Sequence, residues 1–171
     1  MRTLILMRHA KSDWGFPDLA DFDRPLNKRG NRDAPAMGTL IGKSVGTPDL
    51  IIASAAKRTQ ETAGLIAKAS GYGGSIESRH ELYDSAVWDY EKVIQGISND
   101  VHTAVLIGHN PTMERTLSHL CSGGADSTNI IMPTGATAVL ELNVFGWKDV
   151  RKSAAFLKWF AIPKMIHPLS E

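Results

Sequence analysis

Three short apolar segments, each followed by polar residues, constrain the fold of this chain more than any other feature of its sequence. They cover residues 3–7, 49–53 and 103–107, and none shows the spacing of an amphipathic helix. Apolar runs of this length indicate strands that are buried on both faces, as in parallel sheets. Because helical patterns alternate with these strands, the sequence predicts a three-layer α/β/α sandwich with a mostly parallel central sheet.

Apolar residues at helical spacing mark the segments that should cover this sheet. Helices are expected at residues 27–41, 54–69 and 87–97, and another is expected to begin at Pro111. Ser54 is expected to cap the second helix, whereas Pro35 should kink the first or restart it with Asp33 as the cap. Three further strands are expected, a short one near residue 76 and two that pair antiparallel at the sheet edge, residues 136–144 and 154–162.

The composition is that of one ordinary domain. The chain has 171 residues, of which 43% are hydrophobic and 22% are charged. Its formal net charge of +1 excludes a protein that binds nucleic acid or membranes through bulk charge. The one cysteine cannot form an internal disulfide, and no long apolar run lies near the N-terminus. We therefore expect a single domain over residues 1–171, located in the cytoplasm, with neither nucleic acid nor a membrane as its partner.

Arginine and histidine recur just after the three apolar segments. Arg8 and His9 follow the first segment, Ser54 and Arg58 follow the second, and His109 follows the third. Because ligands bind at the carboxyl ends of parallel strands, these side chains should converge on one crevice. Two arginines and two histidines without a carboxylate or cysteine cluster are a poor ligand set for a metal ion, so no metal and no cofactor are expected.

The same residue types suit a phosphoryl group. Guanidinium groups match phosphate oxygens with two parallel hydrogen bonds, and a helix N-terminus offers further donors. A neutral imidazole can attack phosphorus in line, and a second imidazole, if protonated, can stabilise charge on the transferring oxygens. The residue types at the strand ends therefore predict phosphoryl transfer.

Four segments, in order along the chain, resemble motifs of the histidine phosphatase superfamily, which includes the phosphoglycerate mutases. Residues 6–12 resemble its Arg-His-Gly/Ala signature, residues 54–63 its Ser, Arg and Thr-x-x-Thr-Ala motif, and residues 105–111 its third motif. Residues 23–30 are similar to the Asp-Arg-Pro-Leu stretch of the SixA-type phosphohistidine phosphatases. The resemblance covers roughly the whole chain. It implies a phosphoglycerate-mutase-like fold and a metal-independent phosphatase that forms a phosphohistidine enzyme intermediate and acts on phosphohistidine in proteins.

The resemblance also implies a role for each matched residue. His9 would be the nucleophile that takes up the phosphoryl group, and Arg8 and Arg58 would hold the phosphate. His109 would be the second catalytic histidine and would also contact the substrate. Ser12 falls where many members of the superfamily form a hydrogen bond with the phosphate.

The general acid is open between two carboxylates. The Leu-x-Glu pattern of the superfamily maps onto residues 82–84 and gives Asp84, and Glu81 is the alternative. Lys11 replaces the glutamate or glutamine common in mutases, and Gly15 replaces an asparagine often found there. Both departures argue against a sugar-phosphate mutase.

Two alternative functions share the same pocket. A phosphatase of small phosphomonoesters would use the same residues, and a non-catalytic module that binds phosphoproteins would also keep the pocket. Binding alone needs only the arginines, so the presence of both His9 and His109 favours an enzyme. The partner is thus expected to be a phosphorylated protein or a small phosphate ester.

Other charged residues and histidines lack a motif context. Solvated side chains are expected at Lys11, Lys28 and Arg29. Structural roles are expected for His80, His102, His119 and His167.

Overall fold

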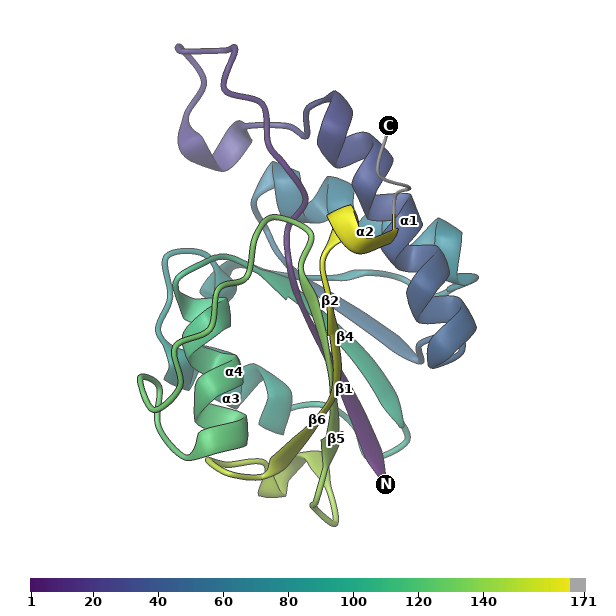
Figure 1. Cartoon of the computed structure of the whole chain (residues 1–171), viewed down its shortest axis with the longest axis vertical. Coiled ribbons are helices and arrows are strands. Elements are labelled where there is room, and N and C mark those ends of the chain that lie inside the picture. The colour runs from purple at the N-terminus through teal and green to yellow at the C-terminus, as the bar shows by residue number, and fades with distance from the viewer. Residues whose placement is uncertain (167–171) are drawn as a thin grey trace.

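A mixed sheet of six strands forms the centre of this computed structural model, which describes residues 1–166 (Figure 1). The strand order is β3-β2-β4-β1-β5-β6. The parallel strands are β1 (Arg2–Arg8), β2 (Leu50–Ser54), β3 (Glu77–Arg79) and β4 (Thr103–Gly108). The antiparallel strands are β5 (Thr137–Leu142) and β6 (Ala155–Ala161). The predicted sheet, mostly parallel with an antiparallel edge, is confirmed.

Helices cover both faces of this sheet, which confirms the three-layer sandwich (Figure 1). The first face is covered by α1 (Lys28–Ser44) and α2 (Lys57–Ser70), and the second by α3 (Val87–Gln95) and α4 (Thr112–Ser122). The shorter elements are α5 (Pro163–Ile166) and three 3₁₀ turns, η1 (Asp21–Asp23), η2 (His80–Leu82) and η3 (Trp147–Asp149). No helix within residues 1–166 is both long and apolar enough to cross a membrane.

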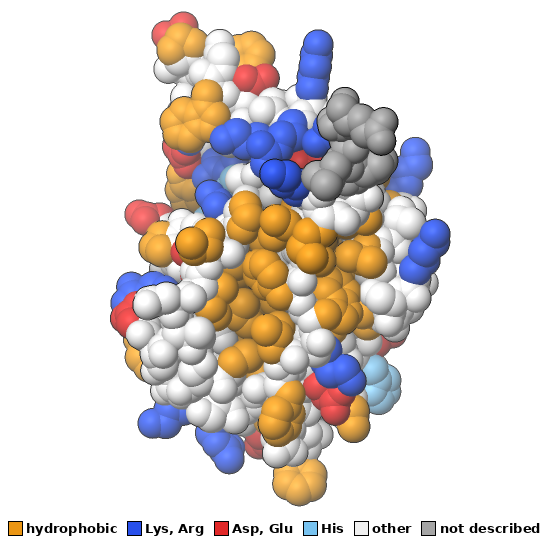
Figure 2. All heavy atoms as spheres, viewed as in Figure 1, with side chains coloured by type: hydrophobic (Ala, Val, Ile, Leu, Met, Phe, Trp, Pro, Cys, Tyr) orange, Lys and Arg blue, Asp and Glu red, His pale blue; other side chains and the backbone are white. Residues whose placement is uncertain are grey.

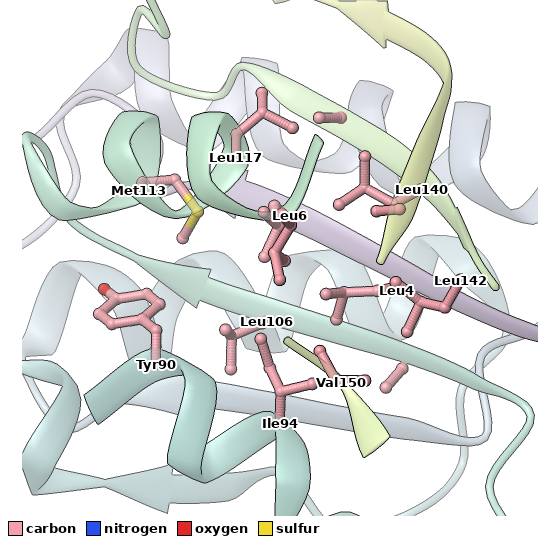
Figure 3. Packing of buried hydrophobic residues seen from close by; sticks show 14 of the residues in the cluster. Leu4, Leu6, Tyr90, Ile94, Leu106, Met113, Leu117, Leu140, Leu142 and Val150 are labelled. Atoms are coloured by element: carbon pink, nitrogen blue, oxygen red, sulfur yellow. The ribbon is translucent and has the colours of Figure 1, made fainter. Parts of the chain in front are cut away.

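Strand β1 shows why the apolar runs lack alternation. Leu4 and Leu6 pack into the core under α3 and α4 (Figure 3), and Ile5 and Met7 pack into the core under α1 and α2. Successive side chains of a strand point to opposite faces, so a strand covered on both faces is apolar at every position. Figure 2 shows hydrophobic side chains gathered on the face of the molecule that the β5–β6 edge occupies, with Lys and Arg side chains above them.

The register of the central strands places the polar ends of β1 and β4 side by side. In this parallel pair, Arg8 lies opposite Gly108, and the backbone N–H of His9 donates to the Gly108 carbonyl at 3.0 Å. The residues that follow the two strands therefore emerge at the same edge. This pairing is the structural basis of the convergence that the sequence predicts.

Helix α1 begins as expected but is not interrupted. Asn27 caps it by accepting a hydrogen bond from the Gly30 N–H at 2.9 Å. The helix continues through Pro35, and Asp33 lies buried within it, where Arg29 and Arg32 donate to its carboxylate. The expected restart with Asp33 as the cap is therefore wrong, because paired arginines stabilise this carboxylate inside the helix.

The expected capping role of Ser54 is also wrong. Ser54 is the last residue of β2, and the ladder continues one residue further because the Ala55 N–H donates to Arg79 of β3. Helix α2 begins only after Ala56, which makes no side-chain cap. Strand pairing thus extends β2 beyond the segment predicted for it and leaves the Ser54 side chain free for another contact.

Candidate active site

His9 lies at the carboxyl end of β1, buried and with a defined tautomer. Its Nδ1 is 2.7 Å from the Ala10 carbonyl, which can only accept, so we assign the proton to Nδ1. Its Nε2 accepts from Nε of Arg58 at 3.3 Å. The side chain is 7% exposed. His9 therefore holds an unprotonated nitrogen toward a guanidinium group, the arrangement that a nucleophile toward phosphorus requires.

His109 faces His9 across the site, with ring centroids 5.2 Å apart. Arg58 Nη2 lies 3.3 Å from Nδ1 of His109, and because arginine can only donate, Nδ1 accepts. The ring proton is then on Nε2, which donates to Ser54 Oγ at 2.9 Å. Ser54 thus fixes the tautomer and orientation of the second histidine, a role that the capping prediction missed.

The backbone before His109 requires a glycine. The His109 N–H donates to the Tyr90 hydroxyl at 3.1 Å, and a Cβ on Gly108 would collide with that hydroxyl. Only glycine lets Tyr90 reach this N–H. The Gly-His pair therefore positions His109 through the buried Tyr90 of α3.

The two arginines approach the histidines from different segments. Arg58 lies in the first turn of α2 and is 6% exposed. Arg8 ends β1, and its Nη1 donates to the Met132 carbonyl at 2.8 Å, while its buried Nε has no partner among residues 1–166. A buried donor without a partner is costly, and a phosphate oxygen would satisfy it.

Two threonines of the second motif hold the site together. Thr62 Oγ1 accepts from the Ala10 N–H at 3.1 Å, which ties the segment after β1 to α2. Thr59 Oγ1 donates to the Ser54 carbonyl at 2.7 Å. Both side chains are buried and fix the backbone beside the catalytic candidates.

Burial and the arginine charges keep both histidines neutral. Desolvation, opposed by the hydrogen bond to the Ala10 carbonyl and reinforced by the neighbouring His109, Arg58 and Arg8, lowers the pKa of His9 to about 3. Desolvation, followed by the charges of Arg58 and Arg8, lowers the pKa of His109 to about 4. At neutral pH the His9 nitrogen that faces Arg58 is therefore available for attack.

Two adjoining cavities open onto these residues. The smaller, of about 350 Å³, is lined by Arg8, His9, Ser12, Arg58 and His109 among others. The larger, of about 700 Å³, shares Arg58 and His109 with it. The smaller cavity surrounds the phosphate-binding candidates, and the larger extends from them toward the start of α4.

The structure brings together five of the predicted site residues in the smaller cavity: Arg8, His9, Ser12, Arg58 and His109. Asp84 lies instead in the wall of the larger cavity, exposed and with a left-handed φ of 50°. Glu81 lies apart from both cavities, pairing with Arg79 at 3.7 Å and lining a separate hollow. Of the two candidate acids, only Asp84 reaches the cavity system that contains His109.

Asp21 is a site residue that the motifs did not reveal. Its Oδ2 lies 2.9 Å from Arg58 Nη2 and accepts from the Tyr83 hydroxyl at 2.8 Å, and its carboxylate also pairs with Arg24. It lines both cavities. The sequence offers one signal, a carboxylate two residues before the matched stretch 23–30, but no indication that it folds back onto Arg58.

The remaining histidines have structural contacts. His119 Nε2 lies 2.6 Å from Glu91 Oε2, His102 contacts Arg2, and His80 stacks on Phe22. His167 lies outside the described residues. Among residues 1–166, no group of three or more His, Cys, Asp or Glu is placed to hold a metal ion.

Comparison with known families identifies this arrangement. The model of the histidine phosphatase superfamily (branch 1) matches residues 4–104. The chain belongs to the histidine phosphatase superfamily. An uncharacterised protein of Mycobacterium leprae is 33% identical over 167 residues, which cover 92% of this chain and 100% of that protein.

Solved structures extend the likeness to SixA proteins. One from Nakamurella multipartitia has a TM-score of 0.80 at 29% identity and covers 99% of this chain and 97% of its own. One from Agrobacterium tumefaciens has a TM-score of 0.78 at 30% identity and covers 95% and 98%. This histidine phosphatase is therefore of the SixA type, and its relatives support a phosphatase that acts on phosphorylated substrates.

Proposed function

We propose that this histidine phosphatase removes phosphoryl groups from phosphohistidine in proteins by transferring them to His9. One observation carries the proposal: the unprotonated Nε2 of the neutral, buried His9 faces Arg58 in the smaller cavity. A binding module would have no use for a nucleophile held in this tautomer. The resemblance to SixA proteins supports the choice of substrate.

The first step transfers the phosphoryl group to the enzyme. Arg8, Arg58 and Ser12 hold the phosphate oxygens, and His109, fixed by Ser54 and Arg58, lies beside them. The lone pair of His9 Nε2 forms a bond to phosphorus as the bond from phosphorus to the leaving group breaks. The leaving atom keeps that electron pair and takes up a proton.

The second step returns His9 to its starting state. A water molecule attacks the phosphorus of the phosphohistidine intermediate, and the bond from phosphorus to Nε2 breaks. Nε2 recovers its lone pair, and inorganic phosphate leaves with the oxygen of the water. No metal is needed, because the arginines supply the positive charge that phosphoryl transfer requires.

Asp84 is the proposed acid for substrates with a basic leaving group. It lies in the wall of the larger cavity, which His109 also lines and into which a leaving group would extend. Its left-handed backbone is one that aspartate and asparagine adopt more readily than other residues with a side chain. This placement favours hydrolysis of small phosphomonoesters as the second candidate function. The imidazole of phosphohistidine depends less on an acid, since its other nitrogen titrates near neutral pH.

We also propose a biological role, a domain organisation and a cellular location for the enzyme. Phosphohistidine on proteins implies a role in signal transduction, and residues 1–171 are proposed to act as one domain. The half-buried Cys121 is a free cysteine, which fits the reducing cytoplasm.

The decisive experiment identifies the phosphorylated residue and the substrate together. The chain is incubated, with a metal chelator present, with a phosphohistidine protein and with a panel of metabolite phosphates. We expect turnover of the phosphohistidine protein and an acid-labile phosphate on His9, both lost in His9→Ala. The matched control Lys28→Ala, at an exposed lysine, should retain most activity. An acid-labile phosphate on another residue contradicts the mechanism, and turnover of a sugar phosphate without activity on phosphohistidine favours the second candidate.

A further inference from the structure

The smaller cavity carries more positive charge than one phosphate requires. Its lining includes four cationic side chains and one carboxylate, namely Arg8, Lys11, Arg24, Arg58 and Asp21. Both histidines of the lining are neutral, because burial holds their pKa values at about 3 and about 4. A phosphate dianion compensates two of the three excess positive charges. One positive charge remains for another group of the ligand.

Arg24 is held in place rather than free in solvent. Its guanidinium group lies 3.6 Å from the centroid of the Trp14 ring, and it pairs with Asp21. Its side chain is 11% exposed, and its buried Nε has no hydrogen-bond partner in the described part of the chain. A stacked, ion-paired arginine has lost most of its conformational freedom before a ligand arrives, and its unpaired donor favours an anionic acceptor.

Lys11 is fixed through its backbone at the opposite end of the same loop. Its carbonyl accepts from the Asn27 N–H at 3.0 Å, and a Cβ on Gly30 would collide with that carbonyl. The start of α1 therefore packs directly on Lys11. Its side chain is half-buried in the cavity lining, in contrast to the exposed Lys28 and Arg29. Within residues 1–166, no carboxylate lies within ion-pair distance of Lys11.

We propose that Lys11 and Arg24 form a second anion-binding subsite beside the phosphate site, which selects substrates with a second negatively charged group near the scissile phosphate. Both residues lie in or beside the loop between β1 and α1, at the end of the molecule where basic side chains gather (Figures 1 and 2). The subsite deepens the proposed function and rests on Arg8 and Arg58 as the phosphate site. The second group is a carboxylate or a phosphate, since both match lysine and arginine donors.

Two probes that differ by one anionic group test the subsite directly. Calorimetry at constant ionic strength compares inorganic phosphate with methylenediphosphonate, in which a carbon atom joins two phosphonates and prevents hydrolysis. We expect the wild type to bind the diphosphonate at least tenfold more tightly than phosphate. Lys11→Gln and Arg24→Gln should each reduce the ratio of the phosphate Kd to the diphosphonate Kd to below threefold. Lys11→Arg, which keeps the charge, should retain the wild-type ratio.

The matched control is Lys28→Gln, which removes the same charge from an exposed position at the start of α1 and should keep the wild-type ratio. Equal binding of the two probes by the wild type, or a ratio that survives both variants, overturns the subsite alone. Absence of binding for both probes overturns the subsite together with the proposed function. The test survives if Arg24→Gln fails to fold, because Lys11→Gln changes the same ratio at a residue that has no ion pair within residues 1–166.

Substrate pairs then identify the source of the second group. A phosphohistidine peptide with a neighbouring glutamate is compared with the same peptide carrying glutamine. Phosphoserine is compared with phosphoethanolamine, which lacks the carboxylate. The subsite predicts a kcat/KM at least fivefold higher for the acidic member of a pair, and Lys11→Gln should abolish this preference. A preference in the peptide pair assigns the second group to a protein, and a preference in the phosphoserine pair assigns it to a small molecule. No preference in either pair contradicts the selection of substrates.

Discussion

Asp21 binds Arg58 through two different groups, with its carboxylate 2.9 Å from Nη2 and its backbone carbonyl 2.5 Å from Nη1. The guanidinium edge that should hold phosphate is thus already occupied by an anion of the same chain. Arg58 also donates to His9 through Nε, so the free enzyme satisfies each of its three nitrogens. A substrate phosphate must share or displace these contacts.

Asp21→Asn should strengthen phosphate binding. The substitution keeps a hydrogen-bond acceptor for Arg58 but removes a negative charge that repels the phosphate dianion. We expect the Kd of inorganic phosphate to fall about threefold to tenfold, which corresponds to roughly 1 kcal/mol of binding free energy. Asp23→Asn, an exposed carboxylate of the same turn, is the matched control and should leave the Kd unchanged. Weaker phosphate binding in Asp21→Asn would show instead that the carboxylate holds Arg58 for the substrate.

Arg58→Ala should lose most of the catalytic rate. The side chain contacts both histidines and lines both cavities, so its removal takes away charge that stabilises the transferring phosphoryl group. We expect kcat/KM to fall by an amount that corresponds to a loss of about 2–4 kcal/mol in transition-state stabilisation. This is comparable to the loss of one oxyanion donor. Steady-state kinetics with an aryl phosphate measure this, and Lys57→Ala, the exposed neighbour in α2, should change the rate little. A loss below threefold in Arg58→Ala would place the residue outside the reaction.

The two candidate acids should separate by substrate. Asp84→Asn should slow hydrolysis of an alkyl phosphomonoester at least tenfold, because an alkoxide needs a proton as it leaves. Asparagine tolerates the left-handed backbone of this position, so the fold should be retained. Dephosphorylation of phosphohistidine should change little, since solvent can protonate its leaving imidazole.

Glu81→Gln is the matched control for this experiment. Its carboxylate lies outside both cavities that contain His109, so neither substrate should respond. Equal losses on the two substrates in Asp84→Asn would contradict the leaving-group argument. A selective loss in Glu81→Gln would return the acid role to that residue.

His9 should make the fold sensitive to acid. Burial lowers the pKa of His9 to about 3, whereas the unfolded chain takes up this proton near pH 6.5. Between these values the unfolded state binds more protons, so the free energy of unfolding decreases as the pH falls. At pH 5 the contribution of His9 to this decrease reaches about 2 kcal/mol.

Urea unfolding at pH 7 and pH 5 measures this effect. His9→Asn should lose about 2 kcal/mol less stability between the two values than the wild type does. His80→Asn, at an exposed histidine, should behave like the wild type. Identical losses in wild type and His9→Asn would show that His9 titrates at its ordinary pKa in the folded protein.

Much of the fold and part of the site could be predicted from the sequence. The apolar runs of β1, β2 and β4 identify buried strands because burial on both faces leaves no polar position, and this pattern is local. The rule that parallel strands end at one edge then predicts that His9 and His109 meet. Their ring centroids are 5.2 Å apart.

Contacts between distant segments decided the rest. Ser54 reaches His109 rather than capping α2, because pairing with β3 extends β2 to this residue. The carboxylate of Asp21 folds back onto Arg58, 37 positions along the chain. Neither partner is marked by local spacing, since each contact depends on how a loop closes over a completed sheet. The sequence by itself determined which residue types gather at the sheet edge, and the tertiary structure decided which charges they face, because only packing brings separate loops within bonding distance.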